Sequence, residues 1–341
     1  MKDIIPNLLS WLQNGETIAI ATVIQTWGSS PRQTGAKMAI TASGKMTGSV
    51  SGGCVEGAVV EAGIEVLKTR EPQLLHFGVA DETAWEVGLA CGGTIEVFVQ
   101  PLDVGQFQRL KAAVEGDYPA AAVTIIRGPT NMLGSSLVWS EKQVPQTSFT
   151  AELEAEMIEA AQSALSGGQP LRRQLPDEHV ELFADVLLPS PMLVIVGGVH
   201  ISIALAKMAK VLGYRTVIVD PRRAFGSAER FPHADQLIQA WPDEALNSLA
   251  ISPTTAIAVL THDPKLDDPA LLAALPGPAY YVGALGSKTT QAKRRQRLLE
   301  AGLSQAQVNR LHGPIGLDLG AHSPEEIALS ILAEIVAARR A

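Results

Sequence analysis

The chain has 341 residues, 46% of them hydrophobic and 18% charged, so it can bury a full core and is long enough for two ordinary domains, which excludes a disordered protein. Its formal net charge of −8 lacks the basic excess of nucleic-acid-binding proteins. Two cysteines are too few for a disulfide framework, the first residues lack a signal peptide's apolar core, and the longest apolar runs are of strand length, so we expect a soluble cytoplasmic protein with no membrane or nucleic-acid partner.

The first half of the chain mixes helix and strand patterns without a fixed alternation. Apolar periodicity and turn residues predict helices over 3–14, 54–68 and 152–165. Runs rich in Ile, Val and Thr predict strands over 17–25, 37–41, 45–50, 94–99, 120–126, 133–139 and 182–188. The segment 167–177 is polar, with glycine and proline, and is expected to be irregular. Residues 1–188 therefore form a mixed α+β domain.

The second half follows a regular strand–helix rhythm after a stiff Pro189-Ser190-Pro191 linker. Strands are predicted over 192–196, 216–219, 257–260 and 280–282, and helices over 200–212 and 327–340. This alternation predicts a parallel sheet with helices on both faces. We therefore expect an α/β protein, in which residues 189–341 form a Rossmann-like, doubly wound domain.

A glycine-rich turn over residues 48–57, GSVSGGCVEG, places Cys54 at the start of a predicted helix. Turn amides and a helix N-terminus attract anions and stabilise a thiolate, so Gly52 and Gly53 predict a cradle and Cys54 a soft ligand or nucleophile. A small residue packed under the turn is an equally good reading. We interpret Glu56 as complementing the helix dipole more than as a proton donor or acceptor.

The second cysteine lies in a similar turn, Cys91-Gly92-Gly93, before a predicted strand. Two glycine–cysteine turns favour both thiols lining one pocket, and a disulfide between them stays open. The sequence has no Cys-x-x-Cys motif and no pair of histidines at ligand spacing, so it does not indicate a zinc site. In the polar loop 28–37, Arg32 and Lys37 are candidate phosphate contacts, the alternative being a solvated loop.

The turn Gly197-Gly198-Val199-His200 follows a strand and opens a helix, as in a dinucleotide fingerprint. Asp220 ends the next predicted strand, where a ribose-binding acid belongs. However, Val199 stands where that fingerprint needs its second glycine, and Ser202 where it needs its third. The pattern therefore indicates a Rossmann-like fold strongly and NAD(P) binding only weakly. His200 is interpreted either as a phosphate contact or simply as a residue of the first helical turn.

Two further loops are expected near the carboxyl edge of this sheet, where open α/β folds bind ligands. The loop containing Gly286, Ser287 and Lys288 leads into a helix whose basic residues, Lys293, Arg294, Arg295 and Arg297, are interpreted as a solvated face. The glycine-rich stretch 312–320 precedes a capping box with proline at the first helical position. In that stretch His312 and Asp318 either reach the crevice or hold the loop.

Taken together, these motifs resemble the XdhC/CoxI family, the accessory factors of xanthine dehydrogenase and related molybdenum hydroxylases. The motifs are SGGCVE at 51–56, CGG at 91–93, GALGSK at 283–288, and HGPIGLD at 312–318 with the capping box after it. The resemblance covers nearly the whole chain and is weakest over about 128–189. The family's usual Gly-Ala-Gly-His differs here at Val199.

The resemblance implies a protein that binds molybdenum cofactor (molybdopterin), protects its sulfurated form and passes it to an apo molybdenum hydroxylase. It further implies a homodimer, with a cysteine desulfurase as an additional partner, and a cofactor-insertion chaperone more than an enzyme with its own turnover. Cys54 and Cys91 are assigned to the metal end. The other candidate cofactor-binding residues are Gly52, Gly53, Glu56, Gly92, Gly93, Arg32, Lys37, Gly197, Gly198, His200, Asp220, Gly286, Ser287, Lys288 and Asp318.

Three alternatives stay open at this stage. An NAD(P)-dependent oxidoreductase rests on the turn at Gly197 and on Asp220, and Val199 disfavours it. A persulfide relay in cofactor sulfuration would use Cys54 and Cys91 as sulfur carriers. A purely structural scaffold is disfavoured by the two glycine–cysteine turns.

Overall fold

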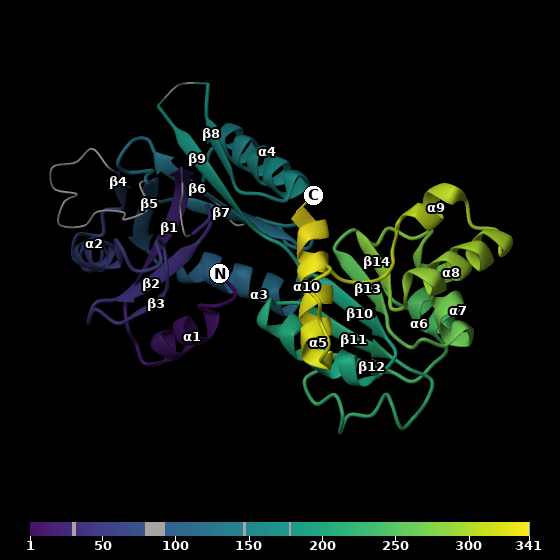
Figure 1. The fold of residues 1–341 in the computed structure, drawn as a ribbon. Coiled ribbons are helices and arrows are strands. Elements are labelled where there is room, and N and C mark those ends of the chain that lie inside the picture. Colours follow the sequence, from purple (N-terminus) through teal and green to yellow (C-terminus); the bar gives the residue numbers. More distant parts are fainter. Residues whose placement is uncertain (29–31, 79–92, 146–147, 177–178, 341) are drawn as a thin grey trace. The chain divides into compact units, whose positions relative to one another are not determined.

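The computed structural model describes residues 1–28, 32–78, 93–145, 148–176 and 179–340. Contacts divide the chain into two compact units, Met1–Pro189 and Ser190–Ala341 (Figure 1). The predicted fold class is confirmed, with an α+β N-terminal unit and a Rossmann-like C-terminal unit. No helix within the described ranges is long and apolar enough to cross a membrane.

The N-terminal unit contains two antiparallel sheets, which among the described residues have the strand orders β3-β2-β1-β5-β4 and β7-β6-β9-β8. Its elements are α1 (Ile5–Gln13), β1 (Ile18–Trp27), β2 (Lys37–Thr41), β3 (Met46–Gly48), α2 (Glu56–Thr69), β4 (Gln73–Phe77), β5 (Thr94–Pro101), α3 (Val104–Glu115), β6 (Ala120–Arg127), β7 (Ser136–Trp139), α4 (Ala151–Gly167), β8 (Leu171–Gln174) and β9 (Glu181–Leu187).

These elements stack in layers, which explains why the central strands are apolar on both faces. Helix α2 packs on one face of the first sheet, and α4 packs on one face of the second. Between the two sheets lies a small core of Ile24, Phe98, Ile126 and Phe183. Strand β1 is buried along its first seven residues because α2 covers one face while α1, α3 and the second sheet cover the other.

Three elements of this unit, β4, α3 and β8, were not expected from the sequence, and β8 shows why a strand can be missed. Residues 171–174, predicted as part of an irregular polar segment, form β8, whose side chains are polar or half-buried. Arg172 on β8 binds the carboxylates of Glu181 and Glu96, and Glu96 belongs to the other sheet. Buried ion pairing, which has no hydrophobic period, therefore holds this strand.

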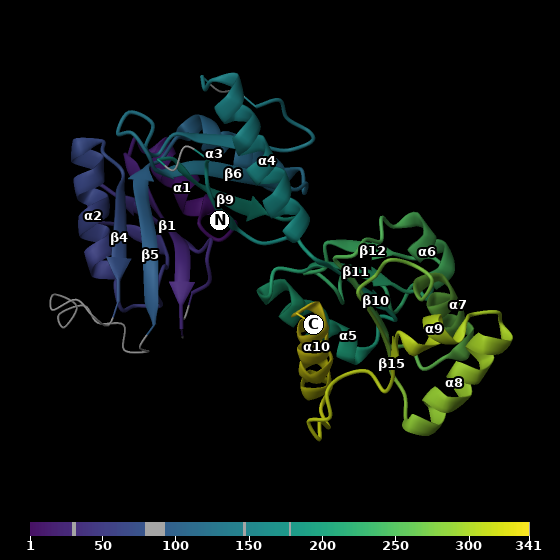
Figure 2. The same ribbon diagram turned by 90° about the horizontal axis from the view of Figure 1, so that it is seen from above.

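The C-terminal unit is a parallel sheet with strand order β12-β11-β10-β13-β14-β15 within the part of the chain that is described. Strands β10, β11 and β12 lie side by side in Figure 2. Its elements are β10 (Met192–Val196), α5 (His200–Val211), β11 (Arg215–Val219), β12 (Gln236–Ile238), α6 (Pro242–Ser248), β13 (Thr255–Val259), α7 (Pro264–Ala274), β14 (Tyr281–Ala284), α8 (Lys288–Glu300), α9 (Gln305–Asn309), β15 (Leu311–His312) and α10 (Pro324–Arg340).

Helices cover both faces of this sheet, as predicted. The core on one face joins the strands to α6, α7, α8 and α9, and the core on the other joins them to α5 and α10. The chain leaves β10 toward β11 on one side and reaches β13 on the other, so the order reverses between β10 and β13. Their carboxyl ends, Val196 and Val259, are aligned in register. Ligands of open α/β sheets bind at such an edge.

Candidate functional site

The Cys54 turn of the N-terminal unit closes around a carboxylate. The side chain of Glu56, 7% exposed, accepts hydrogen bonds from the backbone amides of Val50, Ser51, Gly52 and Gly53, at 2.8 to 3.2 Å. The hydroxyls of Ser49 and Ser51 also donate to it. The amides that the sequence suggested as an anion cradle are thus already bound by an anion of the chain itself.

The electrostatics of this turn follow from the same contacts. Burial by itself raises the pKa of Glu56, but the hydrogen bonds from Ser51 and Ser49 outweigh it and lower the pKa to about 2. Glu56 is therefore ionised at neutral pH and is a poor proton donor. Its role is to fix the backbone from Ser49 to Gly53 so that Cys54 stands just before α2.

Cys54 itself is half-buried. Its amide donates to the Ser51 hydroxyl at 3.0 Å, and its side chain packs at the margin of the core beneath α2. Cys91 and Gly92 lie outside the described residues, so the expectation that both thiols share one pocket stays a prediction. Gly93 is buried directly before β5.

Lys37 has an internal partner. Its ammonium, on β2, lies 2.9 Å from the Asp185 carboxylate and 3.0 Å from the Thr22 hydroxyl. All three residues line a cavity of about 70 Å³ between the two sheets. The predicted phosphate contact of Lys37 is not supported by this geometry, because a phosphate would compete with Asp185. Arg32 lies near Asp3 in the adjoining loop.

In the C-terminal unit, the turn after β10 also holds a carboxylate of the chain. The amide of Gly198 donates to Asp220 at 2.7 Å, and Arg222 donates to Asp220 from its backbone and guanidinium at 2.8 to 2.9 Å. Burial alone raises the pKa of Asp220, but the bonds from Arg222 and Gly198 lower it overall. Asp220, the acid predicted to bind a ribose, is therefore 1% exposed and already hydrogen-bonded to Gly198 and Arg222.

The segment after Asp220 covers the same turn. A Cβ at Gly198 would overlap the backbone carbonyl of Phe225, and Arg230 donates to the Gly198 carbonyl at 2.6 Å. Phe225 is stacked by Arg222, whose guanidinium carbon lies 4.0 Å from the ring centroid. Direct contact of a pyrophosphate with Gly198 would require this segment to move. His200, on the first turn of α5, is exposed.

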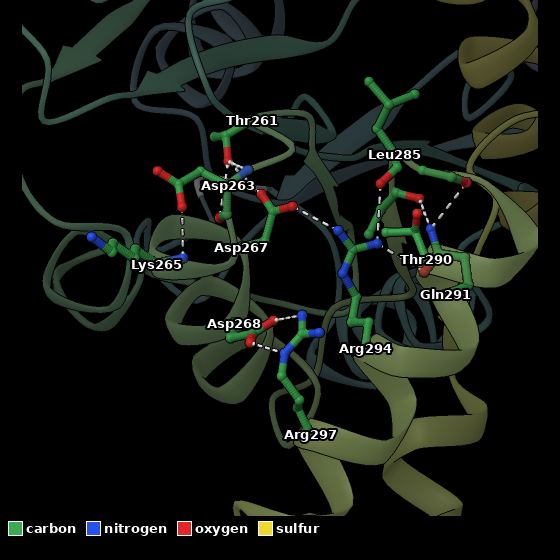
Figure 3. Close-up of polar contacts among 12 residues, drawn as sticks. Thr261, Asp263, Lys265, Asp267, Asp268, Leu285, Thr290, Gln291, Arg294 and Arg297 are labelled. Carbon is green, nitrogen blue, oxygen red and sulfur yellow. Dashed lines mark hydrogen bonds and ion pairs between the residues drawn. The ribbon is translucent and has the colours of Figure 1, made fainter.

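A buried ion pair fixes the loops that follow β13 and β14 (Figure 3). Arg294 on α8 donates to Asp267 on α7 at 2.6 Å, and both side chains are at most 2% exposed. Asp267 accepts from Thr261 after β13, while Arg294 donates to the carbonyl of Leu285 after β14. The pair therefore ties two loops of the carboxyl edge to the helices that follow them.

The prediction that the basic run on α8 is a solvated face is wrong for Arg294 and holds in part for Arg297, whose side chain is 38% exposed. Arg294 is buried, Arg295 donates to the carbonyls of Val308 and Leu311, and Arg297 forms an ion pair with Asp268. Two carboxylates on the preceding helix α7 explain this, because Asp267 binds Arg294 and Asp268 binds Arg297. Lys293 is exposed, as expected.

The N-terminus of α8 and the loop before α10 have the capping residues that the sequence predicted. Ser287 caps α8 by accepting from the Thr290 amide at 3.2 Å, and Lys288 is exposed beside it. Gly286 has φ +139°, a conformation that favours glycine. The predicted capping box at Ser323 and Glu326 is confirmed, and Asp318 is exposed in the loop before it.

Sequence reasoning missed two residues of this region, Tyr281 and Glu334. Tyr281 on β14 donates to Glu334 on α10 at 2.6 Å, and His312 at the end of β15 lies 3.1 Å from the other oxygen of Glu334. The sequence signal that could have identified Glu334 is its place next to Ile331 and Ile335, the buried apolar residues of α10. Because α10 returns from far along the chain, spacing alone could not pair Glu334 with Tyr281.

No group of three or more His, Cys, Asp or Glu side chains that could hold a metal ion occurs within the described ranges. A resident metal cage is therefore not formed by that part of the chain. Among the predicted site residues that the structure describes, Cys54 is half-buried, and His200, Lys288 and Asp318 are exposed.

Comparisons with known proteins agree with this two-unit organisation. Residues 193–335 match the profile described as the XdhC Rossmann domain, and residues 11–78 match that of the XdhC and CoxI family. The chain also resembles a crystal structure from Bacillus halodurans described as a xanthine dehydrogenase, with a TM-score of 0.80 and 26% identity over 98% of this chain and 95% of that one.

Two curated relatives are similar over most of their length. A protein of Bacillus subtilis described as a probable xanthine dehydrogenase subunit is 28% identical, covering 96% of this chain and 95% of the relative. The molybdenum cofactor insertion chaperone PaoD of Escherichia coli is 26% identical, covering 96% of this chain and 85% of the relative.

Proposed function

The chain belongs to the XdhC and CoxI family, and from this membership we propose that it binds molybdenum cofactor and delivers it to an apo molybdenum hydroxylase such as xanthine dehydrogenase. The observation that carries the proposal is the similarity to a molybdenum cofactor insertion chaperone over 96% of this chain. Protection of the sulfurated cofactor, a cysteine desulfurase partner, a homodimer and a cytoplasmic location are further parts of the proposal.

The residues present fit parts of such a ligand in each unit separately. Cys54 supplies a partly accessible thiol, and thiolates are preferred partners of soft metal centres. Lys288 and the amides that open α8 supply positive charge and donors for a phosphate. The bound cofactor would supply the metal and its sulfur ligands, and the chain's contribution is to hold and release it.

The direct test is titration of the purified full chain with molybdenum cofactor, followed by transfer to an apo-hydroxylase. We expect Lys288→Gln to weaken binding about tenfold, which corresponds to about 1.4 kcal/mol for one charge-assisted contact. Lys293→Gln, an exposed lysine further along the same helix, is the matched control and should bind like the wild type.

The thiol is tested separately with Cys54→Ala and Cys54→Ser, which differ in whether a polar atom remains beside the turn. We expect both variants to lose transfer to the apo-hydroxylase. Transfer by either variant at the wild-type rate would remove Cys54 from the mechanism, while failure of the wild type to bind the cofactor would refute the proposed function.

An NAD(P)-dependent oxidoreductase is the alternative that the fold alone suggests. The internal pairing of Asp220 with Arg222 and Gly198 argues against it, since that carboxylate is not free for a ribose hydroxyl. We expect calorimetry of the full chain to detect no binding of NAD(H) or NADP(H). Binding that weakens in Asp220→Ala would favour the oxidoreductase.

A further inference from the structure

His312 lies at the end of β15, and one of its ring nitrogens is hydrogen-bonded to Glu334. Its Nδ1 lies 3.1 Å from Glu334 Oε1, and its side chain is 36% exposed. Its register partner is Gly283, which places it beside Tyr281 on the face of the sheet covered by α10. The Tyr281 and His312 ring centroids are 4.5 Å apart with an interplanar angle of 31°, so Tyr281 occupies one face of the imidazole.

Glu334 is held as a charged acceptor. It receives the Tyr281 hydroxyl at 2.6 Å and the Gly316 amide at 2.7 Å in addition to His312. Burial by itself raises the pKa of Glu334, but the bonds from His312, Tyr281 and Gly316 lower it overall. An ionised carboxylate can accept hydrogen bonds but cannot donate them, so His312 must carry its proton on Nδ1.

The neutral form of His312 then presents a bare Nε2. No hydrogen-bond partner of Nε2 occurs among the described side chains and backbone groups. Tyr281 lies against the ring and Glu334 binds Nδ1, while 36% of the side chain is exposed, so part of the imidazole reaches solvent.

The backbone around this corner is built to hold the arrangement. A Cβ at Gly283 would lie 2.6 Å from the Tyr281 hydroxyl oxygen, and a Cβ at Gly316 would lie 2.6 Å from the Ser330 hydroxyl. A side chain at Gly283 would displace the Tyr281 hydroxyl that binds Glu334, and one at Gly316 would push the amide that binds Glu334 away from α10. The following loop exposes two apolar side chains, Leu317 at 43% and Leu319 at 55%.

We propose that His312, oriented by Glu334 and Tyr281, is a binding position for a flat heteroaromatic ring that carries an N–H donor, and that this ring is the pterin of the cofactor. The ring stacks on the exposed part of the imidazole, and its N–H donates to Nε2. This rests on the proposed function and goes beyond it by assigning the pterin to the C-terminal unit. Glu334 and Tyr281 are positioning residues, because they act through His312.

The first test uses the full chain labelled with ¹⁵N-histidine, without any ligand. Long-range ¹H–¹⁵N spectra are expected to show His312 protonated at Nδ1 and bare at Nε2, and Glu334→Gln is expected to convert it to a tautomer mixture. A wild-type His312 protonated at Nε2 would overturn the proposal.

The second test measures binding of molybdopterin, and of free pterin-6-carboxylate as the probe of the ring alone. We expect His312→Gln to weaken both about tenfold, the scale of one hydrogen bond plus a stacked face. Glu334→Gln should weaken both severalfold, and His233→Gln, an exposed histidine of the same unit, should leave both unchanged. On binding, the His312 Nε2 resonance should shift while that of His233 does not.

The outcomes separate this inference from the proposed function. If the wild type binds molybdopterin but His312→Gln binds it equally, the pterin lies elsewhere and only this inference fails. If the wild type does not bind molybdopterin, both fail. Circular dichroism of each variant confirms that it folds, and Glu334→Gln provides the second readout if His312→Gln is unstable.

Discussion

The two glycine turns that the sequence singled out, at Gly52-Gly53 and at Gly197-Gly198, both close on a carboxylate of the chain itself. In the first, Glu56 is held by four amides and two hydroxyls. In the second, Asp220 is held by a single turn amide together with Arg222. Glycine-rich amides attract an anion in both units, and in both the protein provides that anion.

The difference lies in what would be left behind if the carboxylate were removed. Around Glu56 several buried donors would lose their only described acceptor, and no cation in the described contacts could rearrange to help. Around Asp220 the main partner is the Arg222 side chain, which is 37% exposed and can reach water. Removal of the charge should therefore cost far more in the N-terminal turn.

The largest effect is expected for Glu56→Gln. An amide cannot accept all six hydrogen bonds and places its own donors against the amides of the turn, so the free energy of unfolding should fall by about 3 kcal/mol. Urea denaturation followed by tryptophan fluorescence measures it. Glu61→Gln, an exposed glutamate on the same helix, is the control and should change stability by less than about 0.5 kcal/mol.

The same residue predicts a pH dependence. The pKa of Glu56 is about 2 in the folded chain and near 4.5 when unfolded, so its contribution is complete above about pH 4.5 and is lost as the pH falls toward 2. The difference in stability between wild type and Glu56→Gln should shrink over that window. A constant difference from pH 6 to pH 2 would contradict the assignment of this pKa.

The second effect concerns the glycines themselves. Gly198→Ala places a Cβ onto the Phe225 carbonyl and should destabilise the C-terminal unit by about 2 kcal/mol. Gly57→Ala, on the first turn of α2, meets no atom within 4 Å and should stabilise its helix by up to about 1 kcal/mol. Equal effects of the two substitutions in thermal unfolding would show that the Phe225 segment does not pack on Gly198 in solution.

Much of the fold was predictable because its signals are local. The buried strand β10, the turn after it and the capping box before α10 all follow from apolar runs and capping residues within a few positions. Strand β8 was not predictable in this way, because Arg172 is held by Glu96, 76 residues earlier in the chain. Pairing at that separation leaves no period in the sequence.

The candidate site was predictable as a set of loops but not as a set of free groups. The sequence placed Lys37 at the start of a strand, Asp220 at the end of a strand and Glu56 in the first turn of a helix, as the structure has them. It could not reveal that Asp185, Arg222 and the turn amides already bind them. It also interpreted Arg294 as solvated, because a helical charge run looks the same whether or not Asp267 lies on the next helix.

The smallest effect is expected for Asp220→Asn. The amide oxygen can still accept from Gly198, and Arg222 can turn to water, so the loss of the partly exposed ion pair should cost about 1 kcal/mol. Urea denaturation measures it, and Arg222→Gln should give a similar loss if the pair is the cause. A loss as large as that of Glu56→Gln would mean that Asp220 organises its turn as fully as Glu56 does. The contrast between an amide-held and a cation-held carboxylate would then be wrong.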